Sequence, residues 1–156
     1  MNQSDSVREV IHDLLRHQQL GVLSTVGQGA PYASLVAYAE SEDRRHIYFV
    51  TPRATRKFTN LSANPGVALL ITNSINRPED FHRAAAVTVI GRAASVSHPA
   101  REATIRHYVA KHPYLEDFAR SPSCELLDVR VDRYILVQRF QNVTEYRVDH
   151  DVDHAP

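Results

Sequence analysis

The stretch IYFVTPRATRK, residues 47–57, gives the strongest indication of fold and function in this sequence. Its first five residues are aromatic or β-branched, which is typical of a β-strand, and Pro52 then ends that strand. Thr55, Arg56 and Lys57 follow at the start of a predicted helix, where free N–H groups and partial positive charge gather. A hydroxyl, two cations and a helix N-terminus together suit a phosphomonoester. A capped helix with solvated cations would give the same pattern, so both interpretations stay open at this point.

Strands are predicted on both sides of this stretch, because apolar and polar residues alternate there with period two. The expected strands are residues 20–26, 32–40, 46–51, 67–72, 86–96, 124–137 and 143–148. Several neighbouring strands are joined by tight turns, so antiparallel pairing is expected. The sequence therefore predicts a mainly β fold, a small barrel with peripheral helices rather than a doubly wound sheet.

Helices are expected at three places around this barrel. The first has one apolar face, and a capping box of Ser6 and Glu9 is expected to begin it. The second spans residues 55–63, and the third is expected to carry Pro99 at its first position. Residues 113–123 are expected to be irregular.

Length and composition fit an ordinary globular domain. With 156 residues, 43% apolar and 23% charged, the chain is expected to form one domain over residues 1–148, followed by a polar tail at 149–156. Lys plus Arg is 18 and Asp plus Glu is 18, so no overall field attracts nucleic acid or an anionic membrane, and neither is expected as a partner. The longest aliphatic run, residues 67–71, is far shorter than the roughly 20 residues of a membrane helix.

The single thiol and several histidines are expected to have structural roles. Cys124 is the single cysteine, so an internal disulfide is excluded and a cytoplasmic location is expected. Its thiol is expected to be buried or half-buried. His107 and His112 are expected at the surface or as partners of a helix C-terminal dipole. His150 and His154 belong to a tail that is expected to be solvated, although they could bind a metal or a haem iron beneath a partner surface.

Motifs of other well-known sites are absent from the sequence. There is no Gly-x-Gly-x-x-Gly after a strand, no Walker A sequence and no Gly-x-Ser-x-Gly elbow. With only five glycines in the chain, a glycine-rich phosphate cradle is not expected. Any phosphate must be held by side chains and ordinary backbone amides.

Short segments in a fixed order carry a resemblance to a known family. They are GVLST at 21–25, APYASLV at 30–36, YFVT at 48–51, TRK at 55–57, NLSANP at 60–65 and VIGRA at 89–93. In this order the chain resembles the pyridoxamine 5′-phosphate oxidase-like superfamily of FMN-binding split β-barrels, over roughly residues 7–148. The resemblance implies an antiparallel split β-barrel and a homodimer with two FMN sites at its interface.

The same resemblance implies which residues contact the cofactor. They are Ser34, Leu35, Val36, Phe49, Val50, Thr51, Thr55, Arg56, Lys57, Val87, Arg139 and Phe140. Residues 55–57 would hold the phosphate, residues 49–51 would lie along the ring and ribityl chain, and residues 34–36 would line the same cleft. Segments near 86–87 and 139–140 would reach the flavin of the partner subunit. The implied function is an FMN-dependent oxidoreductase acting on a small molecule, with no obligatory acid or base among its residues.

The chain departs from the true vitamin B6 oxidase at three places. No arginine stands near Ser34, a flavin-contacting glutamine is replaced at about Ala86, and the C-terminal Arg-x-His type of motif is not visible, because Phe140 and Gln141 follow Arg139. Oxidation of pyridoxine phosphate is therefore not expected. Three alternatives stay open: a non-enzymatic flavin- or haem-binding protein, a reductase that uses the deazaflavin F420, and a ligand-free interaction module.

Overall fold

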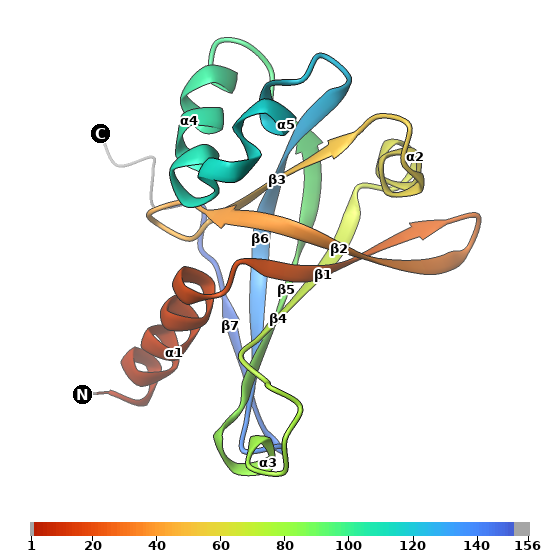
Figure 1. The fold of residues 1–156 in the computed structure, drawn as a ribbon. Coiled ribbons are helices and arrows are strands. Elements are labelled where there is room, and N and C mark those ends of the chain that lie inside the picture. The colour runs from red at the N-terminus through yellow and green to blue at the C-terminus, as the bar shows by residue number, and fades with distance from the viewer. Residues whose placement is uncertain (1, 152–156) are drawn as a thin grey trace.

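The computed structural model describes residues 2–151, and its strands form one sheet that closes on itself (Figure 1). The strands are β1 Leu20–Gly27, β2 Ala30–Glu40, β3 His46–Pro52, β4 Gly66–Thr72, β5 Ala85–Ser95, β6 Cys124–Gln138 and β7 Asn142–Arg147. Their order is β3-β2-β1-β4-β5-β6-β7, and β3 pairs again with β6, which closes a six-stranded barrel and leaves β7 as an extension. Every pairing is antiparallel. The prediction of a mainly β, antiparallel split barrel with peripheral helices is confirmed.

The helices surround the barrel, and the first begins earlier than predicted. They are α1 Gln3–His17, α2 Arg56–Ala63, α3 Asp80–Arg83, α4 Arg101–Lys111, the 3-10 helix η1 Pro113–Leu115 and α5 Glu116–Arg120. Asn2 is the N-cap of α1, and its carbonyl accepts hydrogen bonds from the N–H groups of Asp5 and Ser6. The expected capping box of Ser6 and Glu9 is therefore wrong, because the polar residues before Ser6 already belong to the helix.

Two other expectations about helices are also wrong. Helix α4 begins at Arg101 with Ala100 as its N-cap, so Pro99 lies outside the helix. The segment 113–123, expected to be irregular, contains η1 and α5. Ala119 of α5 is completely buried, so tertiary packing stabilises a helix that is too short to show a periodic pattern.

The hydrophobic core consists of two clusters, separated by the wall of the barrel. The larger cluster fills the interior and includes Tyr38 and Phe49, both without exposed surface. The smaller one contains Val50, Tyr108 and Cys124, and helices α4 and α5 contribute to it. Phe49 and Val50 are consecutive residues in different clusters, so β3 is buried on both faces. The predicted burial of Cys124 is confirmed.

Helix α4 is tied to β2 and α1 by polar side chains. Lys111 Nζ donates hydrogen bonds to the Leu15 carbonyl over 2.6 Å and to Glu40 Oε2 over 2.7 Å. His112 is buried, and its Nε2 lies 2.5 Å from the Tyr38 carbonyl oxygen. The surface position expected for His112 is therefore wrong, because its ring is buried against the Tyr38 carbonyl, although His112 does lie at the C-terminus of α4 as its C-cap. No helix within residues 2–151 has the length and apolar character needed to cross a membrane.

Candidate functional site

Helix α2 is held close to β1 by a buried polar contact. Asn60 Nδ2 donates a hydrogen bond to Thr25 Oγ1 over 3.0 Å, and both residues are buried. Gly27 lies beside the same amide, and a Cβ atom at this position would overlap the Asn60 side chain. The close approach therefore requires glycine, and it fixes the position of α2 against the end of β1.

The turn between β3 and α2 is organised by two threonine hydroxyls. Thr55 is the N-cap of α2, and its Oγ1 accepts a hydrogen bond from the N–H of Phe58 over 3.4 Å. The same hydroxyl donates to the Pro52 carbonyl over 2.9 Å and lies 2.8 Å from Oγ1 of the buried Thr51. The N-terminus of α2 is therefore held rigidly at the end of β3, as the sequence predicts for residues 55–63.

The three cations of this turn have different surroundings. Arg53 turns towards β6, where its Nε donates to Glu125 Oε2 over 2.9 Å and its guanidinium donates to the Pro122 carbonyl. The Arg56 guanidinium lies 5.3 Å from the centre of the Tyr32 ring. Burial lowers the pKa of Lys57. Neither Arg56 nor Lys57 has an ion pair with a carboxylate of residues 2–151, so both charges are available to an anion.

Strand β2 diverges from β3 next to this turn. The two strands pair only through Tyr38–Glu40, and Figure 1 shows them separating towards α2. Ser34 lies in the part of β2 that pairs with β1 but not with β3, on the face that Val36 and Tyr38 turn to the barrel interior. Its Oγ is the one buried side-chain polar atom among the described residues without a hydrogen-bond partner. A buried hydroxyl without a partner is unusual, which makes Ser34 a candidate for contact with a bound group.

Tyr32 is missing from the residues that the sequence assigns to this site. It precedes Ser34 by two positions and so lies on the same face of β2, where it contacts Arg56. The period-two alternation of APYASLV could have indicated it.

The structure places other predicted residues where their side chains cannot reach this junction. Phe49 and Val36 are buried in the barrel interior, and Val50 belongs to the cluster below α4 and α5. Leu35 is 61% exposed and alternates to the outer face of the sheet. Of the positions expected to reach a partner's flavin, Val87 is completely buried, so its side chain is inaccessible.

Arg139 and Phe140 lie in the turn between β6 and β7, beside α3. Both have positive φ angles, 48° and 65°, and Phe140 is 64% exposed. Phe140 packs edge-on against Phe81, with ring centres 5.3 Å apart. The two rings line a mainly apolar cavity of about 660 Å³ together with Ala86. This cavity and the β3–α2 junction share no lining residue, so within one subunit the structure does not bring the two predicted groups together.

The histidines of the C-terminal segment do not form a metal site within the described part of the chain. His150 Nε2 lies 2.7 Å from the Val131 carbonyl oxygen, and His154 is outside the described residues. No group of three or more potential metal ligands occurs within residues 2–151.

Comparison with known proteins relates this arrangement to a family. The sequence matches the pyridoxamine 5′-phosphate oxidase family over residues 7–138. General stress protein 26 of Bacillus subtilis (strain 168) is 32% identical over 71 residues, which are 46% of this chain and 49% of that protein. The chain thus aligns with about half the length of this relative.

Solved structures share the fold at low sequence identity. A haem-binding protein from Mycobacterium smegmatis has a TM-score of 0.76 at 17% identity, over 86% of this chain and 55% of the other. An FAD-binding protein from Mesorhizobium loti has a TM-score of 0.68 at 18% identity, over 83% of this chain and 90% of the other. At these identities the likeness shows the fold alone. The family match extends from α1 to the end of β6 and so includes every strand of the closed barrel. The chain belongs to the pyridoxamine 5′-phosphate oxidase family.

Proposed function

We propose that this chain binds FMN at the junction of β2, β3 and α2, and uses it as an oxidoreductase on a small molecule. The observation that carries the proposal is the Ser34 hydroxyl, which is buried without a partner in the strand that diverges from β3. Leaving such a group unsatisfied costs about 1–3 kcal/mol, and a bound polar molecule would recover this energy.

The residues at the junction fit the parts of FMN. Arg56 and Lys57 would hold the phosphate, with the hydroxyls of Thr51 and Thr55 and the first N–H groups of α2 beside them. Ser34 would make a hydrogen bond with a polar atom further along the cofactor. Phe49 and Val36 are part of the core, so they would act through their backbone and by keeping the strands rigid.

When bound, the flavin supplies hydride or electron transfer, and the protein supplies binding, orientation and exclusion of water. Lys57 is half-buried, and an interaction between its ammonium group and a phosphate would be less screened there than at an open surface. No side chain at the junction is assigned as a proton donor or acceptor.

We further infer that the functional unit is a homodimer formed through the outer face of β2, β1 and β4. Leu35 and Leu70 flank Val22 in the pairing register, and these three apolar side chains are 61%, 41% and 37% exposed. A continuous exposed apolar patch favours association, and a second copy of this chain would cover it symmetrically. Leu35→Glu is expected to convert a dimer to a monomer in light scattering, whereas the exposed Tyr114→Glu is the control.

An absorbance spectrum of the purified protein, followed by titrations with FMN, F420 and haem, tests the proposed cofactor. Saturable FMN binding that Ser34→Ala weakens about tenfold would support it, with the exposed Ser95→Ala as the matched control. Ser34→Ala should leave the melting temperature of the cofactor-free protein unchanged or raised, because it removes an unsatisfied hydroxyl. Tighter binding of F420 than of FMN would identify F420 as the cofactor, and a Soret band would identify haem. For His150 Nε2 to bind a haem iron, the ring would first have to break its contact with the Val131 carbonyl oxygen. If none of the three bound, the oxidoreductase function would be refuted while the fold stood.

A further inference from the structure

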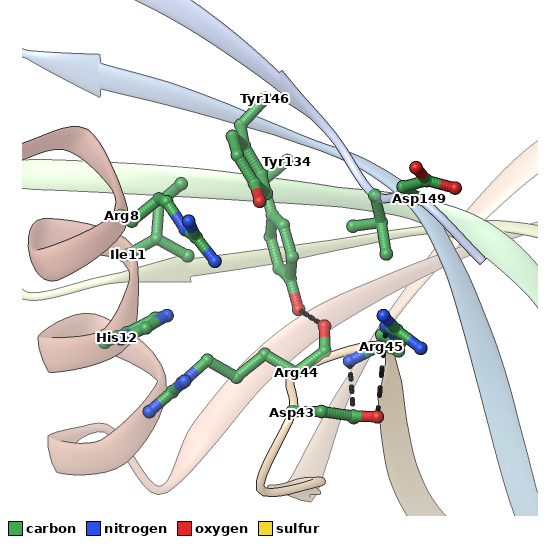
Figure 2. Close-up of a pocket in the computed structure, with 10 residues that line it drawn as sticks. Arg8, Ile11, His12, Asp43, Arg44, Arg45, Tyr134, Tyr146 and Asp149 are labelled. Carbon is green, nitrogen blue, oxygen red and sulfur yellow. Dashed lines mark hydrogen bonds and ion pairs between the residues drawn. The ribbon is translucent and has the colours of Figure 1, made fainter. Parts of the chain in front are cut away.

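A second cavity lies between α1, the β2–β3 turn and the strands β6 and β7 (Figure 2). Its volume is about 370 Å³, which is within the range of small-molecule sites. Its lining includes Arg8 and His12 of α1, Arg44 of the turn, and Tyr134 and Tyr146 of β6 and β7. None of these residues belongs to the junction of β3 and α2, so the cavity is separate from the proposed flavin site.

Three arginines, Arg8, Arg44 and Arg45, line this cavity together with two acids, Asp43 and Asp149. Figure 2 shows the side chains of Arg8, His12 and Arg44 converging from α1 and the turn. Neither Arg8 nor Arg44 has an ion pair within residues 2–151, and the Arg8 guanidinium lies 5.4 Å from the centre of the Tyr146 ring. Burial, followed by the charges of Arg44 and Arg8, lowers the pKa of His12.

The two acids of the cavity wall have other partners. Asp43 accepts hydrogen bonds from the Ser41 hydroxyl over 2.7 Å and from the N–H of Arg45 over 3.0 Å, and Arg45 Nε lies 4.0 Å from the same carboxylate. Asp149 accepts a hydrogen bond from the N–H of Asp151 over 2.8 Å. Arg8 and Arg44 therefore form no ion pair with these two acids, and an added anion would lower the repulsion between the two guanidinium groups.

The backbone of Arg44 is held in an unfavourable conformation. Its φ is 58°, in the left-handed region where glycine is preferred over residues with a side chain. The N–H of Arg44 donates to the Ser41 carbonyl over 3.0 Å, and Tyr134 Oη donates to the Arg44 carbonyl over 2.6 Å. Glycine would satisfy the backbone better, so the arginine side chain is retained here at a cost in stability.

We propose that this cavity is a binding site for a small organic anion, whose phosphate or carboxylate group is held by Arg8 and Arg44 beside His12. Guanidinium groups bind both oxyanions through paired N–H donors. The rings of Tyr134 and Tyr146 and the side chain of Ile11 give the cavity an apolar wall that suits a compact carbon skeleton. The cavity volume of about 370 Å³ is too small to enclose a ligand of the size of a dinucleotide.

Calorimetric titration with inorganic phosphate and with benzoate, at constant ionic strength set by sodium chloride, tests this proposal. Arg56→Ala/Lys57→Ala serves as the background, so that the proposed flavin site does not contribute phosphate binding. Arg44→Gly and Arg8→Gln are each expected to weaken binding by about tenfold or more, since each removes charged hydrogen bonds. Arg16→Gln is the matched control, because Arg16 is exposed on the same helix outside this cavity.

Arg44→Gly also separates binding from folding. Its melting temperature should equal or exceed that of the parent protein, because glycine accepts the positive φ. In the parent protein the bound anion should raise the pKa of His12, as followed by NMR of the imidazole ring. Binding of phosphate alone would identify a phosphomonoester ligand, and binding of benzoate alone an aromatic carboxylate. Absence of saturable binding of both, or equal affinity in Arg44→Gly and Arg16→Gln, would overturn the proposal.

Discussion

The three cations that follow β3 give the sharpest test of the proposed flavin site, because the structure predicts a different effect for each. Lys57 is half-buried without an ion pair in the described chain, Arg56 is exposed over the Tyr32 ring, and Arg53 is engaged with Glu125. Lys57→Met keeps most of the apolar stem and removes only the charge. We therefore expect the affinity for FMN to fall most in Lys57→Met, less in Arg56→Ala and hardly at all in Arg53→Ala.

The magnitudes follow from the surroundings of each charge. A charge-assisted hydrogen bond is worth about 1.5–3 kcal/mol, so loss of the partly desolvated Lys57 should weaken FMN roughly 10–150-fold. An exposed ion pair contributes about 1 kcal/mol or less, which limits Arg56→Ala to roughly fivefold. Arg53→Ala should instead reduce thermal stability, because Glu125 would lose its partner.

Quenching of flavin fluorescence on binding gives these dissociation constants, and its pH dependence gives an independent check. Burial lowers the pKa of Lys57 below the ordinary value of 10.5, so FMN affinity should start to fall at a lower alkaline pH than an exposed lysine would cause. Lys57→Met should lose this alkaline decrease. Equal losses of affinity in all three variants would refute the reasoning, because they would show that only the overall charge of the turn matters.

Three further predictions concern the framework around the site. Gly27→Ala should lower the melting temperature and the FMN affinity together, because a Cβ atom would displace Asn60 and with it α2; thermal unfolding and flavin titration of one sample check this. The hydrogen bond that His46 Nδ1 donates to the Asp128 carboxylate raises the pKa of His46 in the folded state, so its stabilising effect is complete below pH 6.5 and is lost as pH rises through the raised value. Urea unfolding of His46→Gln should therefore show a deficit at pH 5.5 that disappears at pH 9. The Cys124 thiol is 2% exposed and should react with Ellman's reagent only at the rate of unfolding; fast reaction in the native protein would contradict its burial.

The barrel could be predicted from sequence because its signal is local. Alternation of apolar and polar residues identifies each strand, and tight turns such as residues 41–45 impose antiparallel neighbours. The pairing of β3 with β6 closes the barrel between residues such as Tyr48 and Asp128, and no local pattern marks that contact. Helix α5 was missed for a similar reason, since Ala119 becomes apolar core only after the chain has folded.

The candidate site likewise has features that the local sequence predicts and features that depend on contacts between distant residues. The sequence places Thr55 at the start of a helix, and in the structure Thr55 is the N-cap of α2. The different surroundings of Arg53 and of its neighbours Arg56 and Lys57 cannot be predicted from the sequence, because Glu125, the partner of Arg53, is 72 positions away. The buried Ser34 hydroxyl is likewise a property of packing, since a serine in an alternating strand reads as an ordinary surface residue. Whether the assigned residues contact FMN stays a prediction.

The total charge of the chain is zero, but the ion pairs in the structure indicate more about its partners than this total does. With equal numbers of acids and bases the chain has no strong overall field, so a large polyanion such as nucleic acid is not expected as a partner. These equal numbers do not determine how charges pair. Within residues 2–151, acids pair with Arg53 and Lys111, whereas Arg56 and Lys57 at the start of α2 and Arg8 and Arg44 in the cavity beside α1 form no ion pair. Unpaired cations at two separate places, the start of α2 and the cavity beside α1, in a chain without net charge, favour small anions over large ones that cover a whole face. A salt titration distinguishes the two cases, because binding in a recess should be much less sensitive to ionic strength than binding to an open face.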